Sequence, residues 1–383
     1  SSMALTTTGI NNTAVGAKSL ESNTTASDNT AIGFSAMLAN TTGIRNTAVG
    51  RRALVSNTTG QDNEAFGRHA LESNTTGSQN CGLGRAALNA NTTGNYNVGV
   101  GYGSVNSTTA NYNTGVGYRA LGNCTTGAGN VAVGSDCLLS NTTGASNTVV
   151  GTSAMDSLTT GVQNTAVGYQ AGGAQTTAVS NTLVGYLAAD YQNNLTTGSD
   201  NVVIGAYART AAATTIESVN IGRYVLGQGS TTITLGVNGN GVSIPANNST
   251  TSWSKHSDER LKKNIKSSDV GLDFINDLRP VTYQWKNKNE ISPEYEFYYD
   301  EQSDKKAFGD EGATYHGFIA QEIKQAIDNH EDIADGHAIW RETVYDLQNV
   351  AEGSLIPMMV RAIQQLSNKC DSLQEKINIL EGE

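Results

Sequence analysis

The five-residue word Asn-Thr-Ala-Val-Gly, with variants, recurs along more than half of the chain and constrains its fold more than any other feature. Nearly every step between copies is 17 residues, and the exceptions are 16 from Asn97 to Asn113 and 20 from Asn181 to Asn201. The copies start at Asn12, Asn29, Asn46, Asn63, Asn80, Asn97, Asn113, Asn130, Asn147, Asn164, Asn181, Asn201 and Ser218. A period this short and this persistent predicts the stacked turns of a solenoid.

The fourth residue of the word is always large and apolar, whereas the third is usually small, as in Ala14 and Gly82. Neighbouring strand residues point to opposite faces, so we expect both faces of this strand to be covered. A coil of short strands and turns has a narrow interior, so a single chain would bury little and expose an apolar stripe. We therefore expect three chains to share the second face.

The remainder of each copy predicts a second strand and a turn. Pairs such as Ala53-Leu54 and Ala70-Leu71 place small and large residues back to back, and Asn-Thr-Thr-Gly supplies the turn, with glycine at positive φ. This tetrapeptide also matches the glycosylation sequon, but its fixed place in the repeat favours a structural role. At most one threonine of each adjacent pair can point outward, which disfavours an ice-binding face.

Proline and charge separate the two ends of the chain. All four prolines follow residue 244, so residues 1–244 can donate every backbone N–H to a ladder. Residues 251–383 hold 15 of the 24 Lys and Arg and 25 of the 35 Asp and Glu. The net charge of -11 argues against nucleic acid or an anionic membrane as the main partner.

Targeting segments and metal motifs are not expected. No apolar run approaches the ~20 residues of a membrane span. The first ten residues lack the charged and apolar regions of a signal peptide, so we expect neither export nor membrane insertion. Cys81, Cys124, Cys137 and Cys370 lack metal-ligand spacing and are interpreted as free, packed thiols. We expect no metal and no cofactor.

Residues 5–226 resemble the parallel β-roll heads of trimeric autotransporter adhesins, whose Ser-Val-Ala-Ile-Gly turns are similar to Asn-Thr-Ala-Val-Gly, and similar repeats in phage tail fibres. The resemblance implies a mainly β fold, in which residues 1–226 form a trimeric parallel β-roll or β-helix shaft. Residues 227–256 are expected to form a β neck and a flexible joint, with strand-like runs at Thr231–Val237 and Gly241–Ile244.

Three ordered blocks follow: "HSDERLKKNI", "GLDFINDLRPVTYQW" and "HGFIAQEI". Together they resemble the self-cleaving intramolecular chaperone domain that ends many phage tailspike and tail-fibre proteins, including endosialidases. The resemblance covers residues 251–383 and implies a small α+β chaperone domain at 257–383. It further implies cleavage between His256 and Ser257, with Ser257 as the nucleophile and Lys262 as the general base.

The proposed chemistry is plausible for these residue types. A serine hydroxyl is a weak nucleophile until a base takes its proton, and a lysine can be that base only if it is neutral. Cationic neighbours of Lys262, and burial at a subunit contact, would disfavour its charged form, whereas Asp258 and Glu259 oppose this. His256 is a weaker alternative base, and attack within one chain or between chains stays open, as do the oxyanion donors.

The spacing of Ser257 and Lys262 sets a geometric condition. Residues five apart on a helix point roughly 140° apart, so Ser257 is expected just outside a helix that carries Lys262. An N-cap position satisfies this condition, and Ser257 followed by Asp258 and Glu259 is also an ordinary helix start. Capping alone does not explain why the other two blocks follow.

The end of the chain keeps a heptad over about residues 356–381, which predicts a coiled coil. Its two core positions hold Ile356, Ile363, Cys370 and Ile377, and Met359, Leu366, Leu373 and Leu380. Isoleucine at one position with leucine at the other leans toward dimers, so the trimer expectation rests on the shaft and the resemblance. Upstream, Ile319, Ile323 and Ile327 predict one core-facing side of an amphipathic helix.

These observations predict a homotrimeric viral tail fibre, made in the host cytoplasm and carried on the virion. Its expected partners are a host cell-surface receptor, either a glycan or a surface protein, and other virion tail proteins. The expected enzyme is a serine endopeptidase that cuts its own chain. The alternatives are a bacterial trimeric surface adhesin, which should end in a membrane-anchoring β segment, and a polysaccharide-degrading tailspike. A hydrolase needs two carboxylates across a sugar, and Asp62 and Glu64 are the nearest pair in the shaft.

Overall fold

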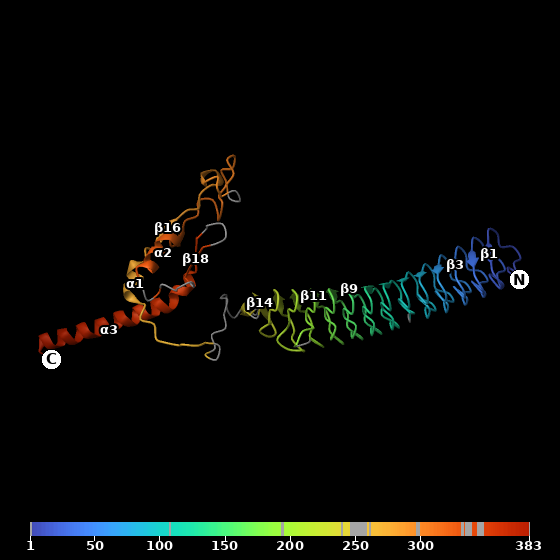
Figure 1. The fold of residues 1–383 in the computed structure, drawn as a ribbon, viewed down its shortest axis with the longest axis horizontal. Coiled ribbons are helices and arrows are strands. Elements are labelled where there is room, and N and C mark those ends of the chain that lie inside the picture. Colours follow the sequence, from blue (N-terminus) through green and yellow to red (C-terminus); the bar gives the residue numbers. More distant parts are fainter. Residues whose placement is uncertain are drawn as a thin grey trace. The chain divides into compact units, whose positions relative to one another are not determined.

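The computed structural model describes residues 2–106, 109–192, 195–238, 240–245, 259, 262–295, 299–330, 333, 339–342 and 348–382. The chain divides into two compact units, Ser1–Ser257 and Asp258–Glu383, each with its own core. Figure 1 shows the first unit as a regular stack of coils and the second as short helices and strands with one long C-terminal helix.

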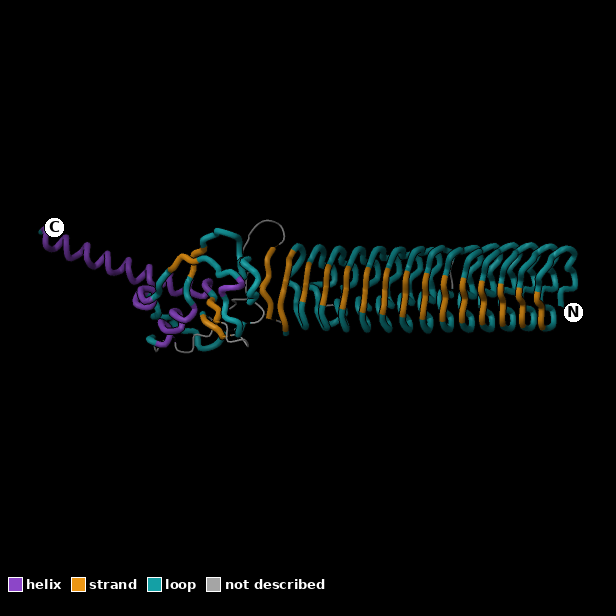
Figure 2. The backbone as a smooth tube through the Cα atoms, turned by 90° about the horizontal axis from the view of Figure 1, so that it is seen from above, coloured by secondary structure: helices purple, strands orange, loops and turns teal. Residues whose placement is uncertain are grey.

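The first unit is a parallel β-solenoid in which each sequence repeat forms one turn. Each turn contributes one three-residue strand, and the strands pair in chain order, with Thr13 opposite Thr30 and Thr30 opposite Thr47. Figure 2 shows these strands following one another along the shaft. They are β1 (Thr13–Val15), β2 (Thr30–Ile32), β3 (Thr47–Val49), β4 (Glu64–Phe66), β5 (Cys81–Leu83), β6 (Val98–Val100), β7 (Thr114–Val116), β8 (Val131–Val133), β9 (Thr148–Val150), β10 (Thr165–Val167), β11 (Thr182–Val184), β12 (Val202–Ile204) and β13 (Val219–Ile221). The expected solenoid is confirmed, and the steps of 16 and 20 residues keep the same register.

The middle residue of each strand points into the coil, and the last residue points out of it. Ala48 and Ala65 are fully buried. The outward set, which we call the apolar stripe, comprises Val15, Ile32, Val49, Phe66, Leu83, Val100, Val116, Val133, Val150, Val167, Val184, Ile204 and Ile221. Val15 is 56% exposed and Leu83 is 48% exposed. The apolar stripe predicted from the sequence is therefore exposed in a single chain.

The predicted second strand is wrong. The residues after each strand form turns, and Arg52 and Leu54 lie at φ 59° and 50°. With the backbone turned in this way, Ala53 and Leu54 are both fully buried, rather than pointing to opposite faces. The interior of the coil is filled by these leucines and by the alanines of the strands. The narrow coil closes through residues in the left-handed backbone conformation. The alternation of inward and outward side chains that is typical of a strand does not apply to such residues.

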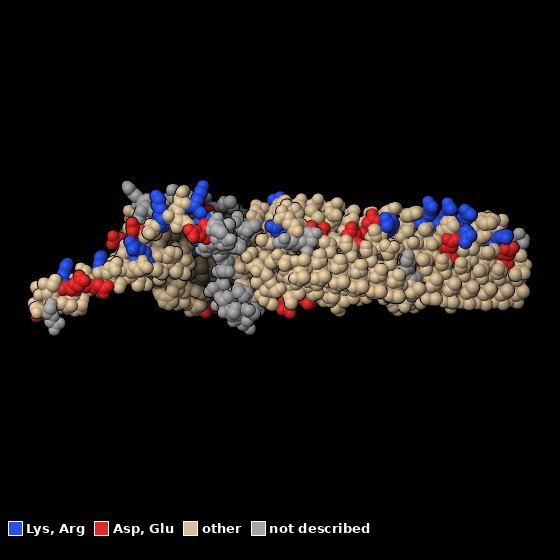
Figure 3. All heavy atoms as spheres, turned by 90° about the horizontal axis from the view of Figure 1, so that it is seen from below, with Lys and Arg blue, Asp and Glu red and all other residues tan. Residues whose placement is uncertain are grey.

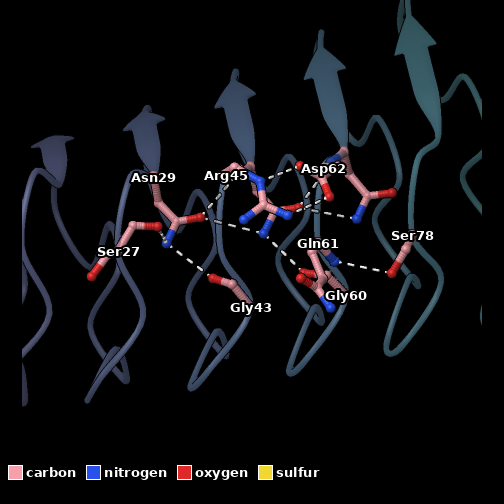
Figure 4. A network of polar contacts seen from close by, with 10 residues as sticks. Ser27, Asn29, Gly43, Arg45, Gly60, Gln61, Asp62 and Ser78 are labelled. Carbon is pink, nitrogen blue, oxygen red and sulfur yellow. Dashed lines mark hydrogen bonds and ion pairs between the residues drawn. The ribbon is translucent and has the colours of Figure 1, made fainter.

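Buried asparagines join each turn to the next. Asn29 Nδ2 donates to the carbonyl of Gly43 (3.0 Å), and Asn29 Oδ1 accepts from the backbone N–H of Asn46 (2.9 Å). Figure 4 shows this contact beside an exposed ion pair in which Arg45 donates twice to Asp62. Each such hydrogen bond contributes about 1 kcal/mol net, and leaving a buried amide unpaired costs more. The first asparagine of the repeat is therefore a structural residue.

The Asn-Thr-Thr-Gly segment is also structural, but for a different reason from the predicted one. Its glycines do not lie at positive φ; instead, a Cβ on Gly60 would lie 2.3 Å from the carbonyl oxygen of Gly77. Asn57 is fully buried and donates to the carbonyl of Gly60 (3.0 Å), so its amide is not available for a sugar. Positive φ occurs at the glycine that ends each strand, such as Gly67 at 139°.

Beyond the last turn the sheet ends in a hairpin. Strand β14 (Thr232–Val237) pairs in parallel with β13, and β15 (Asn240–Pro245) pairs antiparallel with β14. The two strand-like runs expected in the neck are thus the last two strands of the shaft sheet. The change from parallel to antiparallel pairing ends the solenoid.

The cysteines are only partly packed. Cys124 and Cys137 are buried, and burial raises the pKa of the Cys137 thiol to about 12. Cys81 is half-buried, but Cys370 is exposed, which contradicts the expectation of a packed thiol in the single chain. Cys370 lies at a core position of the predicted coiled coil. In a single chain no second helix covers this position.

Asp190 in the shaft predicts a measurable pH dependence of stability. Burial raises its pKa to about 6, above the usual value of about 3.9, although its Oδ1 accepts from the N–H of Ala174 (2.9 Å). The folded state then holds this proton more tightly, so stability increases as the pH falls from about 6 to about 4. We expect Asp190→Asn, which keeps the acceptor, to raise the melting temperature at pH 7.5 by roughly 2–4 °C and to change it little at pH 4.

Thermal unfolding followed by circular dichroism at both pH values measures this effect. The exposed Asp200→Asn substitution is the matched control and should leave both melting temperatures unchanged. A lower melting temperature for Asp190→Asn at pH 7.5 would contradict the assignment.

The second unit is a small α+β domain. Its elements are α1 (Leu272–Asp277), β16 (Val281–Tyr283), η2 (Lys288–Glu290), β17 (Tyr315–Gly317), α2 (Ala320–Asp328), β18 (Trp340–Glu342), β19 (Gln348–Val350), η4 (Glu352–Leu355) and α3 (Ile356–Glu381). Strands β16 and β17 pair antiparallel, as do β18 and β19. Ile323 and Ile327 of α2 enter the core as predicted, but Ile319 precedes the helix and is exposed.

Candidate cleavage and chaperone site

The predicted cleavage site is only partly within the described residues. His256 and Ser257 lie outside them, so their roles stay predictions. Lys262 is described, and its backbone N–H donates to the carbonyl of Glu259 (3.0 Å). The expected helix that carries Lys262 is wrong: from Lys262 to the start of α1 the backbone is irregular. Lys262 is exposed in the single chain, so any burial of its amine must come from elsewhere.

The segment that starts at Lys262 is attached to the domain at its far end. Val270 is buried in the core, and Asp269 accepts a hydrogen bond from Arg361 Nη2 (2.8 Å). Gln365 Oε1 accepts from the backbone N–H of Leu272 (2.6 Å), and its Nε2 donates to the carbonyl of Asp269 (3.3 Å). We call these contacts of α3 with residues 269–272 the α3 clamp. The chain that continues from the cleavage segment is thereby held directly by α3.

Gly271 leaves room for the clamp. A Cβ on Gly271 would lie 2.4 Å from Gln365 Oε1 and 2.9 Å from Arg361 Cγ. A side chain at this position would therefore push the flexible Gln365 and Arg361 side chains away from their clamp partners. The role of Gly271, Arg361 and Gln365 was not predicted from the sequence. The only signal was a glycine before an apolar run, and it does not identify the distant partner.

Two polar contacts tie α2 and the residues after it to the α1 region. His330 pairs with Asp277 across 2.8 Å, and its ring meets Phe274 edge-on with centroids 5.4 Å apart. Arg279 Nε donates to Glu322 (3.0 Å), and this contact lowers the pKa of the Glu322 carboxyl. Phe274 of α1 and Ile323 of α2 are buried in one apolar core, which holds the two helices together. The polar contacts add to this packing and orient the helices.

The long helix α3 presents apolar residues to solvent. Ile363 is 65% exposed and Leu373 is 57% exposed. The heptad core positions Ile356, Met359, Leu366, Ile377 and Leu380 are exposed as well. Only Ala362 of this helix is buried among the described residues. Such a stripe at heptad spacing is typical of a helix that associates with copies of itself.

The domain also has an open aromatic cavity of about 280 Å³. It is lined by Gln284, Trp285, Lys286, Ile291, Tyr295, Ala307 and Phe308. The ring of Trp285 lies 4.8 Å from that of Phe308, and both side chains stay partly exposed. The sequence did not predict this cavity, because residues from three separate segments between 284 and 308 form it.

The fold thus defines a class: a β-solenoid shaft followed by a small α+β domain that ends in a long helix. Residues 257–331 match the family model described as chaperone of endosialidase, a peptidase family. No curated protein and no solved structure matches the chain. The match and the solenoid together fit an endosialidase-like tail protein that carries an intramolecular chaperone. The peptidase family suggests autocatalytic cleavage by a serine-type domain.

Within the described ranges, no three His, Cys, Asp or Glu side chains lie close enough to hold a metal ion. None of the helices in the part of the chain that the structure describes is long and apolar enough to cross a membrane.

Proposed function

We propose that the chain is a homotrimeric phage tail fibre whose C-terminal domain drives trimerisation and then cleaves itself off before Ser257. The observation that carries this proposal is the exposure of apolar stripes on both units, along the shaft and along α3. Burying one such side chain stabilises an assembly by about 1.5–3 kcal/mol, so covering a whole stripe is strongly favourable. The fibre would act on the virion, joined to other tail proteins and bound to a host surface receptor.

Parallel shafts explain the need for a chaperone. Neighbouring turns are nearly identical, so a slip of one whole turn between chains exchanges one apolar side chain for an equivalent one. Such a slip costs little locally, and contacts far apart in sequence form slowly. A C-terminal helix that associates first would hold the three chains in one register before the shafts pack.

The proposed cleavage uses a Ser-Lys dyad. The Ser257 oxygen attacks the carbonyl carbon of the His256–Ser257 bond while its proton moves to Lys262 Nζ, and the peptide nitrogen leaves with that proton, so an ester forms on the serine oxygen. Water then hydrolyses this ester, which releases the His256 carboxylate and restores the serine hydroxyl. A charged lysine cannot take this proton, and the exposure of Lys262 in one chain supports a base that becomes active only in the assembly. The α3 clamp supports a link between the two events, because it joins the segment that follows Lys262 to the helix that would associate.

Intact mass and sedimentation of the expressed full-length chain test this proposal. We expect two fragments in place of a single 40.1 kDa chain, and a sedimenting particle that contains three shafts. An uncut chain that sediments as a single well-behaved polypeptide would refute both parts of the proposal.

A further inference from the structure

One exposed position of the repeat carries aromatic or cationic side chains in consecutive turns. It is the residue directly after the glycine that ends each strand. Its occupants are Phe34, Arg51, Arg68, Arg85, Tyr102 and Tyr118, all of them exposed. We call this set the arginine–tyrosine row. These residues are distinct from those of the apolar stripe, and the proposed cleavage uses none of them.

The backbone holds the row in register. The N–H of His69 donates to the carbonyl of Arg51 (3.0 Å), and the N–H of Ala86 donates to the carbonyl of Arg68 (3.0 Å). Successive members therefore stand about 4.8 Å apart, the spacing of paired strands. The rings of Tyr102 and Tyr118 stack with centroids 5.5 Å apart, and the Arg85 guanidinium lies 5.4 Å from the Tyr102 ring. The row is a rigid, preorganised surface.

The positive charge of the row is not neutralised within the shaft. Other arginines have acidic partners, in the pairs Arg45–Asp62, Arg52–Glu72 and Arg119–Asp136. In the described part of the shaft, Arg51, Arg68 and Arg85 form no ion pair. Like charges one turn apart repel each other, so this arrangement has a cost that an anionic partner would relieve. Figure 3 shows Lys and Arg gathered along one edge of the N-terminal half of the shaft.

We propose that the arginine–tyrosine row binds an acidic polysaccharide laid along the shaft axis, a chain of pyranose rings that bear carboxylates. Guanidinium groups form bidentate hydrogen bonds with carboxylates, and exposed aromatic rings offer flat apolar faces to the C–H faces of sugars. The rise of one turn is close to the length of one pyranose residue, so successive sugars meet successive turns. The inference rests on the proposed receptor binding and deepens it by naming the ligand class.

Binding of the purified full chain to immobilised polygalacturonate tests the proposal, with dextran as the neutral polymer. We expect binding to polygalacturonate alone, and a loss of affinity of at least about tenfold in a triple variant with Arg51→Gln, Arg68→Gln and Arg85→Gln. The matched control is a triple variant with Lys18→Gln, Arg45→Gln and Arg52→Gln. It removes the same charge from shaft positions outside the row and should change the affinity less than about twofold. A double variant, Tyr102→Ala with Tyr118→Ala, should weaken binding without any change in charge.

Three results would overturn the proposal. The first is an equal loss in the two triple variants, which would show non-specific attraction of a polyanion. The second is equally tight binding of single-stranded DNA with the same dependence on the row, which would indicate a nucleic-acid partner. The third is absence of polygalacturonate binding by a chain that sediments as a trimer and is cut normally. That last result would leave the proposed assembly and cleavage standing.

Discussion

Replacing Ser257 by alanine is expected to abolish cleavage and to leave a single chain of 40.1 kDa in an intact trimer. Without the hydroxyl there is no nucleophile for the His256 carbonyl, so the rate should fall by at least about a thousandfold. Lys262→Ala should have the same effect, because the serine then loses its base. Intact mass spectrometry after timed incubation measures both rates, and sedimentation confirms the trimer.

Control variants separate chemistry from folding. Ser257→Cys restores a nucleophile and should recover part of the cleavage, whereas His256→Ala should leave it largely unchanged. Cutting of the Ser257→Ala chain at the same bond would contradict the nucleophile assignment. Normal processing of Lys262→Ala would instead assign the base to His256.

Mixed trimers decide where the dyad is assembled. Co-expression of Ser257→Ala chains with Lys262→Ala chains places an intact serine and an intact lysine on different chains of one particle. Cutting of the Lys262→Ala chains would show that the lysine acts on a neighbour, and no cutting would show that the dyad lies within one chain.

Deleting residues 257–383 before expression is expected to give aggregated or monomeric shaft, the second large effect. The shaft alone still exposes its apolar stripe, but no coiled coil aligns the three copies, so mismatched registers compete with the correct one. Size-exclusion chromatography with light scattering measures the outcome. A soluble, homogeneous trimer from this truncated chain would refute the chaperone role.

A fused trimeric coiled coil is the control for this deletion. Placed after residue 256, it clamps three chains together without any of the native domain. Recovery of soluble trimers would show that the domain works by holding the C-termini together. The native chain after cleavage should also stay trimeric, since the packed shafts no longer need the clamp to choose a register.

The sequence predicted most of the shaft, because its physics is local and repeated. A period of 17 residues predicts stacked turns, and the alternation of small and large residues within one word predicts which side chain points out. The exposed apolar positions of the shaft and of α3 follow from the same kind of pattern. The predicted second strand is wrong, because left-handed residues such as Leu54 break the alternation that identifies a strand.

The structure of the candidate site could be predicted less well from sequence patterns. The family match covers the segment from Ser257 onward, as the ordered blocks suggested, but the helix expected for Lys262 is replaced by an irregular segment. Helix propensity and capping residues could not reveal this, because the far end of the segment is held by Gln365 and Arg361, more than ninety residues away.

The sequence by itself therefore determined the repeat, its register and the side chains that need a neighbour. Only the tertiary structure decided that both Ala53 and Leu54 point inward, that Gly271 lies against α3, and that the three arginines of the row have no acidic partner among the described residues. The physical reason is distance along the chain. Periodicity predicts the local conformation of neighbouring residues. The closing turns, the α3 clamp and the unpaired arginines depend instead on contacts between residues that are far apart in the sequence.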